Sequence, residues 1–246
     1  GGRIERVPVT EDLTIDMAAL LAAAARKPRM LMFSNPMNPV GCWLTPVELA
    51  AVIAALDAQT LLVIDEAYAE YAAGDDYPSA IDMLKGKDIP WVVLRTFSKA
   101  YGLAGLRIGY GVVSDTGLCD FFNRARTPFN TNAIAQASAV AALEDLDHLA
   151  QSVKSALTER ERLKTALAAA GYRIAPSKGN FLFIDAGKNA SDLAVALLKR
   201  GVIVKPWKQP GFETFIRVSI GSREENDHFL RALADAEGVD AAKSAG

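Results

Sequence analysis

The chain has 246 residues, of which 50% are hydrophobic and 23% charged, and its formal net charge is −2 at pH 7. This balance is typical of a globular protein with one large or two modest domains, and it gives no sign of a basic surface for nucleic acid. No apolar run is long enough to cross a bilayer, and the first residues lack the apolar core of a signal peptide. Cys42 and Cys119 provide neither a disulfide framework nor metal-ligand spacing, so we expect a cytoplasmic protein without a bound metal.

Strand and helix patterns alternate along the first half of the chain. Residues 2–9 are expected to form a strand, and residues 16–27 an alanine-rich helix. Four further strands, all rich in apolar residues, are predicted at 29–34, 60–65, 91–96 and 107–113. Such alternation with short connections predicts an α/β fold around a mostly parallel sheet, with helices on both faces.

One helix start is marked with unusual clarity. Thr45 occupies the N-cap position, Pro46 the first helical position, and Glu48 the position that completes a capping box. These signals predict a helix that runs from this point through Leu56. A loop or short helix is expected at residues 73–87, where glycine, aspartate and proline are frequent.

The second half of the chain is mainly helical at first and mixed afterwards. Helices are predicted at 116–126, 132–145, 146–170, 192–201 and 223–237, and strands at 172–177, 180–186, 202–207 and 215–221. The last residues, 238–246, are expected to be frayed. We interpret residues 1–150 as a large domain and residues 151–246 as a smaller α+β domain. The long helix predicted at 146–170 joins them.

Polar side chains follow three of the buried strands, at the point where each strand ends. Asn38 lies in the turn after the first of these strands, Asp65 ends the second, and Lys99 follows the third. Ligands of an open parallel sheet bind outside the carboxyl ends of its strands, so we expect the three side chains to converge on one crevice. Asp65 alone would also suit a helix cap, and Asn38 a turn.

Lys99 is the residue with the clearest chemical meaning. A buried ammonium is costly unless it is paired, whereas a lysine amine that condenses with a carbonyl is a standard covalent catalyst. Thr96, Ser98 and Arg107 supply the hydroxyls and the guanidinium that hold a phosphate. An aldehyde that carries a phosphate describes pyridoxal 5′-phosphate, so we expect this cofactor.

The other side chains at the strand ends suit the pyridine ring of that cofactor. Its nitrogen stays protonated only beside an anion, which Asp65 would supply. Its phenolic oxygen takes hydrogen bonds, which the Asn38 amide and the Tyr68 hydroxyl can donate.

Three motifs carry a resemblance to a known family. The chain resembles the fold-type I pyridoxal-phosphate aminotransferases of class I/II in SNPMNPVG, IDEAYAEY and RTFSKAYGLAGLRIGYGVV. The resemblance implies a fold-type I transferase and gives cofactor contacts to matching positions, namely Asn38, Asp65, Tyr68, Thr96, Ser98, Lys99 and Arg107. Met37 and Val40 depart from residues frequent in the first motif, but neither change removes the Asn38 amide.

Further segments are similar to histidinol-phosphate aminotransferases, namely RTPFNTNAIAQ, GVIVKPW and FIRVSIGSREENDHFL. This similarity implies transamination between L-histidinol phosphate and 2-oxoglutarate, in a homodimer with small-molecule substrates. It also implies that Arg217 binds the substrate carboxylate, where a structural salt bridge is the alternative. Lys205 matches a basic position for the substrate phosphate, although a solvent-facing lysine fits there nearly as well. Aromatic amino acids are the second choice of substrate.

The resemblance also leaves part of the expected site without a match. Residue 1 corresponds to a point inside the large domain of the family. The N-terminal arm, the glycine-containing loop at the phosphate and the aromatic residue that stacks on the pyridine ring therefore have no counterpart in residues 1–28. The alternative reading is a fragment, or a non-catalytic remnant of an aminotransferase.

Overall fold

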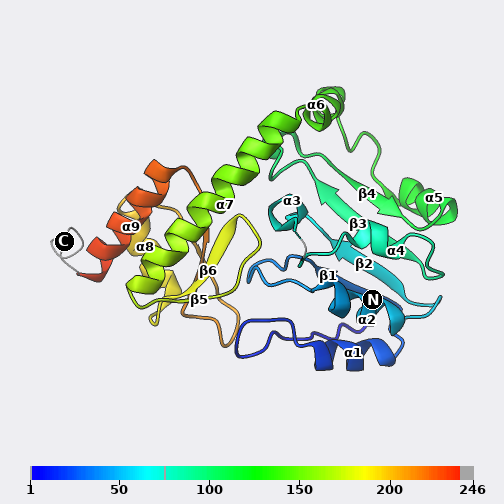
Figure 1. Ribbon diagram of the computed structural model, residues 1–246, viewed down its shortest axis with the longest axis horizontal. Helices are drawn as coiled ribbons and strands as arrows, with labels where there is room; N and C mark the ends of the chain where they lie inside the picture. The colour runs from blue at the N-terminus through cyan, green and yellow to red at the C-terminus, as the bar shows by residue number, and fades with distance from the viewer. Residues whose placement is uncertain (1, 75, 239–246) are drawn as a thin grey trace.

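The computed structural model describes residues 2–74 and 76–238, and the strands in this part form two four-stranded sheets (Figure 1). The first sheet has the order β1-β2-β3-β4 and contains β1 (Met30–Ser34), β2 (Leu61–Asp65), β3 (Trp91–Thr96) and β4 (Gly109–Val113). Strands β1, β2 and β3 are parallel, and β4 runs antiparallel to β3. The sheet is therefore mixed but mostly parallel.

The second sheet is antiparallel throughout. It has the order β5-β6-β8-β7 and contains β5 (Arg173–Ile174), β6 (Phe181–Asp185), β7 (Lys205–Pro206) and β8 (Phe215–Ser219). Its apolar residues pack against helices α8 (Ala190–Leu198) and α9 (Arg223–Glu237) and the end of α7 (Leu146–Ala169). The 24-residue helix α7 extends from the region of the first sheet to the second (Figure 1).

Helices α1 (Met17–Ala25), α2 (Pro46–Ala54) and α4 (Ala80–Leu84) pack against the first sheet through one buried apolar cluster. The predicted cap of α2 is confirmed, because Thr45 and Glu48 form a reciprocal capping box. The remaining helices of the described part are α3 (Ala69–Ala72), α5 (Thr116–Ala125) and α6 (Ala133–Glu144). None of the described helices is both long enough and apolar enough to span a membrane.

A third apolar cluster packs the loop after β1 against the second sheet. Val40 and Cys42, in the loop after β1, pack with Phe183 and Phe215 of the second sheet. The loop that carries Asn38 is thereby fixed against β6 and β8.

Three strand predictions need correction. Residues 2–9 do not form a strand, and only Val9 makes an isolated bridge, to Ile15. Pro8 lacks the backbone donor that a ladder requires, and residues 2–6 are exposed. The strands expected at 172–177 and 202–207 are reduced to Arg173–Ile174 and Lys205–Pro206, which form the two edges of the second sheet. Proline is tolerated in strands at such edges. The fraying expected for 238–246 concerns residues that, from 239 on, lie outside the described part.

Candidate active site

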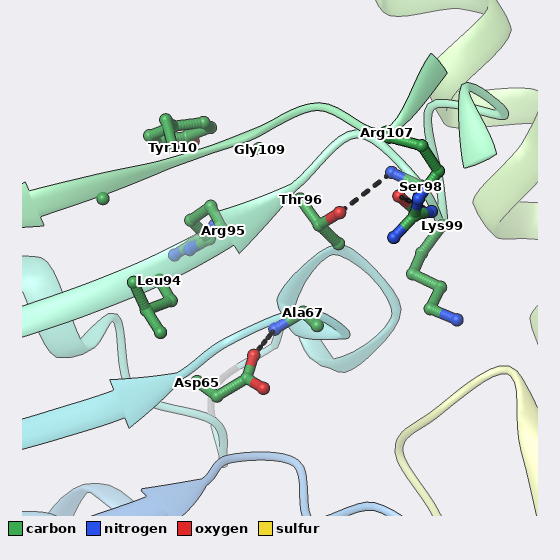
Figure 2. Close-up of a pocket in the computed structure, with 11 residues that line it drawn as sticks. Asp65, Ala67, Leu94, Arg95, Thr96, Ser98, Lys99, Arg107, Gly109 and Tyr110 are labelled. Carbon is green, nitrogen blue, oxygen red and sulfur yellow. Dashed lines mark hydrogen bonds between the residues drawn. The ribbon is translucent and has the colours of Figure 1, made fainter. Parts of the chain in front are cut away.

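A cavity of about 560 Å³ lies at the carboxyl ends of β2 and β3 (Figure 2). Strand register brings its walls together, because Asp65 pairs with Leu94 and Thr96 pairs with Gly109. The cavity is lined by Asp65, Ala67, Leu94, Arg95, Thr96, Ser98, Lys99, Arg107, Gly109, Tyr110 and Gly111. Five of the predicted site residues therefore share one cavity, as expected for polar groups at the ends of neighbouring strands.

The carboxylate of Asp65 is held by the turn that follows its own strand. Its Oδ1 accepts a hydrogen bond from the backbone N–H of Ala67 at 3.0 Å. This local turn is typical of aspartate and fixes the orientation of the carboxylate at the end of β2. Asp65 is half-buried and lines the cavity, so an anion is presented there at a defined position.

The turn after β3 positions the amine and the two hydroxyls. The backbone N–H of Ser98 donates to Oγ1 of Thr96 at 3.1 Å, and the N–H of Gly102 donates to the carbonyl of Lys99 at 3.0 Å. Phe97 is buried and packs against the ring of Tyr101, so it holds the turn against the interior of the protein. Thr96, Ser98 and Lys99 are left half-buried at the cavity wall.

Arg107 reaches the same turn from a constrained backbone position. It follows the short 3₁₀ helix Ala104–Leu106 with φ of 53°, in the left-handed region that non-glycine residues adopt rarely. Its Nη1 donates to the carbonyl of Ala104 at 2.8 Å and to Oγ of Ser98 at 3.4 Å. Backbone strain of this kind concentrates at functional sites. Here it accompanies a guanidinium aimed at a serine hydroxyl.

Aromatic rings connect Lys99 to the second sheet. The Nζ of Lys99 lies 5.2 Å from the ring centroid of Tyr68, which is buried. Tyr68 packs edge-on against Phe181 of β6, with 5.1 Å between the ring centroids. The guanidinium carbon of Arg217 lies 5.4 Å from the centroid of the same Phe181 ring. The sequence predicts Phe181 only as part of a strand, and no motif indicates that its ring contacts Tyr68 and Arg217.

The four other predicted site residues, Asn38, Tyr68, Arg217 and Lys205, lie outside the cavity lining. Arg217 donates from Nη1 to Oδ1 of Asn38, and its Nε is buried without a partner among the described residues. Lys205 is exposed and pairs directly across the β7–β8 ladder with Arg217. Like charges directly opposite each other destabilise a sheet, so two adjacent cations are best suited to a site for an anion.

Sequence reasoning missed an ion pair between the buried Glu66 and the half-buried Arg95, of which Arg95 lines the cavity. Glu66 is completely buried, and Arg95 donates from Nε to its Oε2 at 2.7 Å. Burial raises the pKa of Glu66, and the charge of Arg95 opposes this effect. The sequence signal that could have indicated this pair is the position of Glu66 directly after Asp65 in the motif IDEAYAEY.

Comparison with known proteins identifies the family of this site. Residues 1–233 match the model of the family "Aminotransferase class I and II". The chain belongs to this family. It is 73% identical over 239 residues to histidinol-phosphate aminotransferase 3 of Rhizobium meliloti strain 1021, covering 97% of this chain and 65% of that protein.

Other relatives of this class I and II aminotransferase chain agree with that assignment. A histidinol-phosphate aminotransferase 2 of Pseudomonas aeruginosa is 46% identical, over 89% of this chain and 58% of its own length. The crystal structure of histidinol-phosphate aminotransferase from Sinorhizobium meliloti, in complex with pyridoxal-5′-phosphate, aligns with a TM-score of 0.85 and 37% identity. That alignment covers 96% of this chain and 64% of the crystallised one. The chain thus has the class I and II aminotransferase fold, and it spans about two thirds of the length of these relatives.

Proposed function

We propose that this protein is a pyridoxal-phosphate-dependent aminotransferase and that its substrate is L-histidinol phosphate. The observation that carries the proposal is the donor set of one cavity, with the amine of Lys99, the carboxylate of Asp65 and the phosphate-binding groups of Thr96, Ser98 and Arg107. An amine, an anion and a set of hydroxyl and guanidinium donors match the three reactive parts of this cofactor. These residues therefore fit pyridoxal phosphate.

Each part of the cofactor has named residues that would hold it. The phosphate would accept hydrogen bonds from Thr96, Ser98 and Arg107, whose hydroxyls and guanidinium already lie in contact through Ser98. Asp65 would pair with the ring nitrogen. Tyr68 and Asn38 would donate to the phenolic oxygen, and for Asn38 this requires that its amide nitrogen faces the cavity while its oxygen bonds Arg217.

Pyridoxal phosphate, when bound, supplies an aldehyde that condenses with amines and a ring that withdraws electrons from the bond being broken. The residues of the chain move and hold protons around it. Lys99 takes the proton from the α-carbon of the amino donor and returns it during the exchange of amine for carbonyl. Asp65 holds the proton on the ring nitrogen, which preserves the electron demand of the ring. Lys99, Asp65 and Tyr68 are thus the proposed catalytic residues.

The choice of substrate rests on the cations at the edge of the second sheet and on the relatives. Arg217 would bind the carboxylate of 2-oxoglutarate or glutamate with its two-pronged guanidinium, and Lys205 the phosphate of histidinol phosphate. The products would be imidazole acetol phosphate and L-glutamate, a step of histidine biosynthesis. The names of the relatives support this choice over an aromatic amino donor.

The organisation of the protein belongs to the same proposal. We propose a large cofactor domain in residues 1–150 and a small domain in residues 151–246, with the boundary in α7. A homodimer and a cytoplasmic location complete it, and the free thiols of Cys42 and Cys119 suit a reducing compartment.

The test is to add pyridoxal phosphate to the purified chain, reduce with borohydride and map the modified peptide by mass spectrometry. We expect a visible absorption band before reduction, and afterwards the cofactor mass attached to Lys99. Lys99→Ala should lose both signals, whereas Lys164→Ala, which removes an exposed lysine of α7, should keep them. Cofactor attached to scattered lysines, with no visible band, would contradict the proposal and favour a fragment that keeps the residues without the activity.

The substrate needs its own experiment once the cofactor is in place. L-histidinol phosphate, phenylalanine and tyrosine are offered separately with 2-oxoglutarate, and glutamate is measured. We expect histidinol phosphate to be consumed most efficiently, and Lys205→Met to reduce that preference selectively. Equal or better use of the aromatic amino acids would favour the second choice of substrate.

A further inference from the structure

The ion pair of the buried Glu66 and the half-buried Arg95 has no part in the proposed chemistry, yet Arg95 lines the same cavity as the residues that do. Glu66 follows Asp65 at the end of β2, and Arg95 precedes Thr96 at the end of β3. Successive side chains of a strand point to opposite faces. Because Asp65 is paired with Leu94, the contact between Glu66 and Arg95 joins the two strand ends on the face opposite Asp65.

Glu66 and Arg95 meet at the end of the β2–β3 ladder, just before the turn that carries Lys99. The backbone N–H of Glu66 donates to the carbonyl of Leu94 at 2.9 Å. Beyond Arg95 the chain is held at two further points: the N–H of Phe97 donates to the carbonyl of Ile108 at 3.2 Å, and the N–H of Ser98 donates to Oγ1 of Thr96 at 3.1 Å, one residue before Lys99. A displacement of Arg95 would be transmitted to Lys99 through this hydrogen-bonded segment.

The carboxylate of Glu66 is well anchored on its own side. Its Oε1 accepts from the N–H of Ala80 at 3.2 Å, while the hydroxyl of Tyr77 lies 3.3 Å away. The shorter contact of that hydroxyl is 2.6 Å, to the carbonyl of Asn35, to which it donates. Since the side chain of Glu66 is wholly buried among these partners, Arg95 is attached to a rigid point.

A second carboxylate provides a comparison. Glu70 of α3 lies 3.6 Å from Nη1 of Arg95, and its Oε2 is buried without a partner among the described residues. Two carboxylates thus face one guanidinium, but only Glu66 makes short hydrogen bonds to it. Glu70 is therefore a matched control of the same charge at the same arginine.

We propose that Glu66 is a positioning residue for Lys99: through Arg95 it fixes the turn after β3 relative to the Asp65 end of β2. The inference rests on the proposed function, because the relative position of Lys99 and Asp65 matters when both face one cofactor. Misplacement by about 1 Å is enough to slow a reaction about a hundredfold, so a small release of this turn has a measurable effect.

The experiment compares Glu66→Gln and Glu70→Gln with the unchanged chain, using two measurements. The first is the rate at which pyridoxal phosphate becomes fixed to Lys99 under borohydride, relative to its fixation on Lys164. The second is backbone hydrogen exchange of the cofactor-free chains, followed in peptides covering residues 95–100, 30–34 and 181–185. We expect Glu66→Gln to slow fixation on Lys99 by about tenfold or more, to speed exchange at 95–100 and to leave the other two peptides unchanged. Glu70→Gln should resemble the unchanged chain in both measurements.

Several outcomes would overturn the proposal. Unchanged fixation and exchange in Glu66→Gln would show that the contact positions nothing, and an equal effect of Glu70→Gln would assign the effect to charge alone. Faster exchange throughout the first sheet would make the pair merely structural. If Glu66→Gln does not fold, Glu66→Asp keeps the charge with a shorter reach, and the same readouts apply. If the unchanged chain does not fix the cofactor on Lys99, the proposed function fails, and the exchange of residues 95–100 alone decides whether Glu66 holds this turn.

Discussion

The guanidinium of Arg217 donates a hydrogen bond from Nη1 to Oδ1 of Asn38, across 179 residues of sequence. Arg217 belongs to β8 of the second sheet, whereas Asn38 lies in the loop after β1 of the first. The bond therefore connects the proposed site of the substrate carboxylate with a proposed contact of the cofactor. An anion bound by Arg217 would share this guanidinium with Oδ1 of Asn38, so we expect the two contacts to be coupled.

Arg217→Lys should weaken the binding of 2-oxoglutarate, because lysine offers a single ammonium in place of the two-pronged guanidinium. We expect the dissociation constant to rise about tenfold to a hundredfold, which corresponds to the loss of a charged hydrogen bond of about 1.5–3 kcal/mol. The cofactor-loaded chain is titrated with 2-oxoglutarate, and its thermal unfolding temperature is followed. Lys199→Met, at an exposed position at the end of α8, should leave this titration unchanged. Unaltered affinity in Arg217→Lys would assign the carboxylate to another group.

Thr45→Ala should destabilise the folded chain by removing the cap of α2. Oγ1 of Thr45 accepts from the N–H of Glu48, and Oε2 of Glu48 accepts from the N–H of Thr45 at 2.7 Å. Loss of such a cap costs about 1 kcal/mol, measurable as a lower urea midpoint. Val47→Ala in the same turn, at an exposed position, serves as the control and should change little. A midpoint equal to that of the unchanged chain would mean that packing alone holds α2.

The local part of the fold was readable from the sequence. The α2 cap, the apolar strands and the long helix after Leu146 depend on neighbouring residues and their periodicity, and all three are present in the structure. The grouping of Asp65 with Lys99 was also predictable, because parallel strands that end in polar residues meet at one edge of a sheet.

The contacts that sequence reasoning missed are those between distant segments. Phe181 lies between Tyr68 and Arg217, and nothing in the pattern of its own strand distinguishes it from Phe183, which packs into the aromatic cluster with Phe215. Residues 2–9 carry the composition of a strand, but a strand also needs a neighbour to pair with. Periodicity reports which face of an element is apolar, and it does not report what that face will contact.

The two thiols should differ sharply in reactivity. Burial raises the pKa of Cys42 to about 12, whereas Cys119 is exposed. Only the thiolate is a nucleophile, so Cys42 remains protonated and unreactive until the pH approaches that raised value. At mildly alkaline pH, iodoacetamide should label Cys119 alone in the folded chain and both cysteines in urea, as shown by peptide mass. Labelling of Cys42 in the folded chain at a similar rate would indicate that the loop after β1 opens readily.

Arg107→Gln should weaken the binding of pyridoxal phosphate without affecting pyridoxal, which lacks the phosphate. Glutamine retains a side chain at the same left-handed backbone position, so the backbone cost is similar and the main loss is the guanidinium charge beside Ser98. We expect the dissociation constant for pyridoxal phosphate to rise about tenfold to a hundredfold, measured by absorption titration. Arg6→Gln, which removes an exposed arginine outside the cavity lining, should bind both compounds as the unchanged protein does. If both compounds lost affinity equally in Arg107→Gln, the residue would be maintaining the turn around Lys99, and the phosphate would have to be held by other groups.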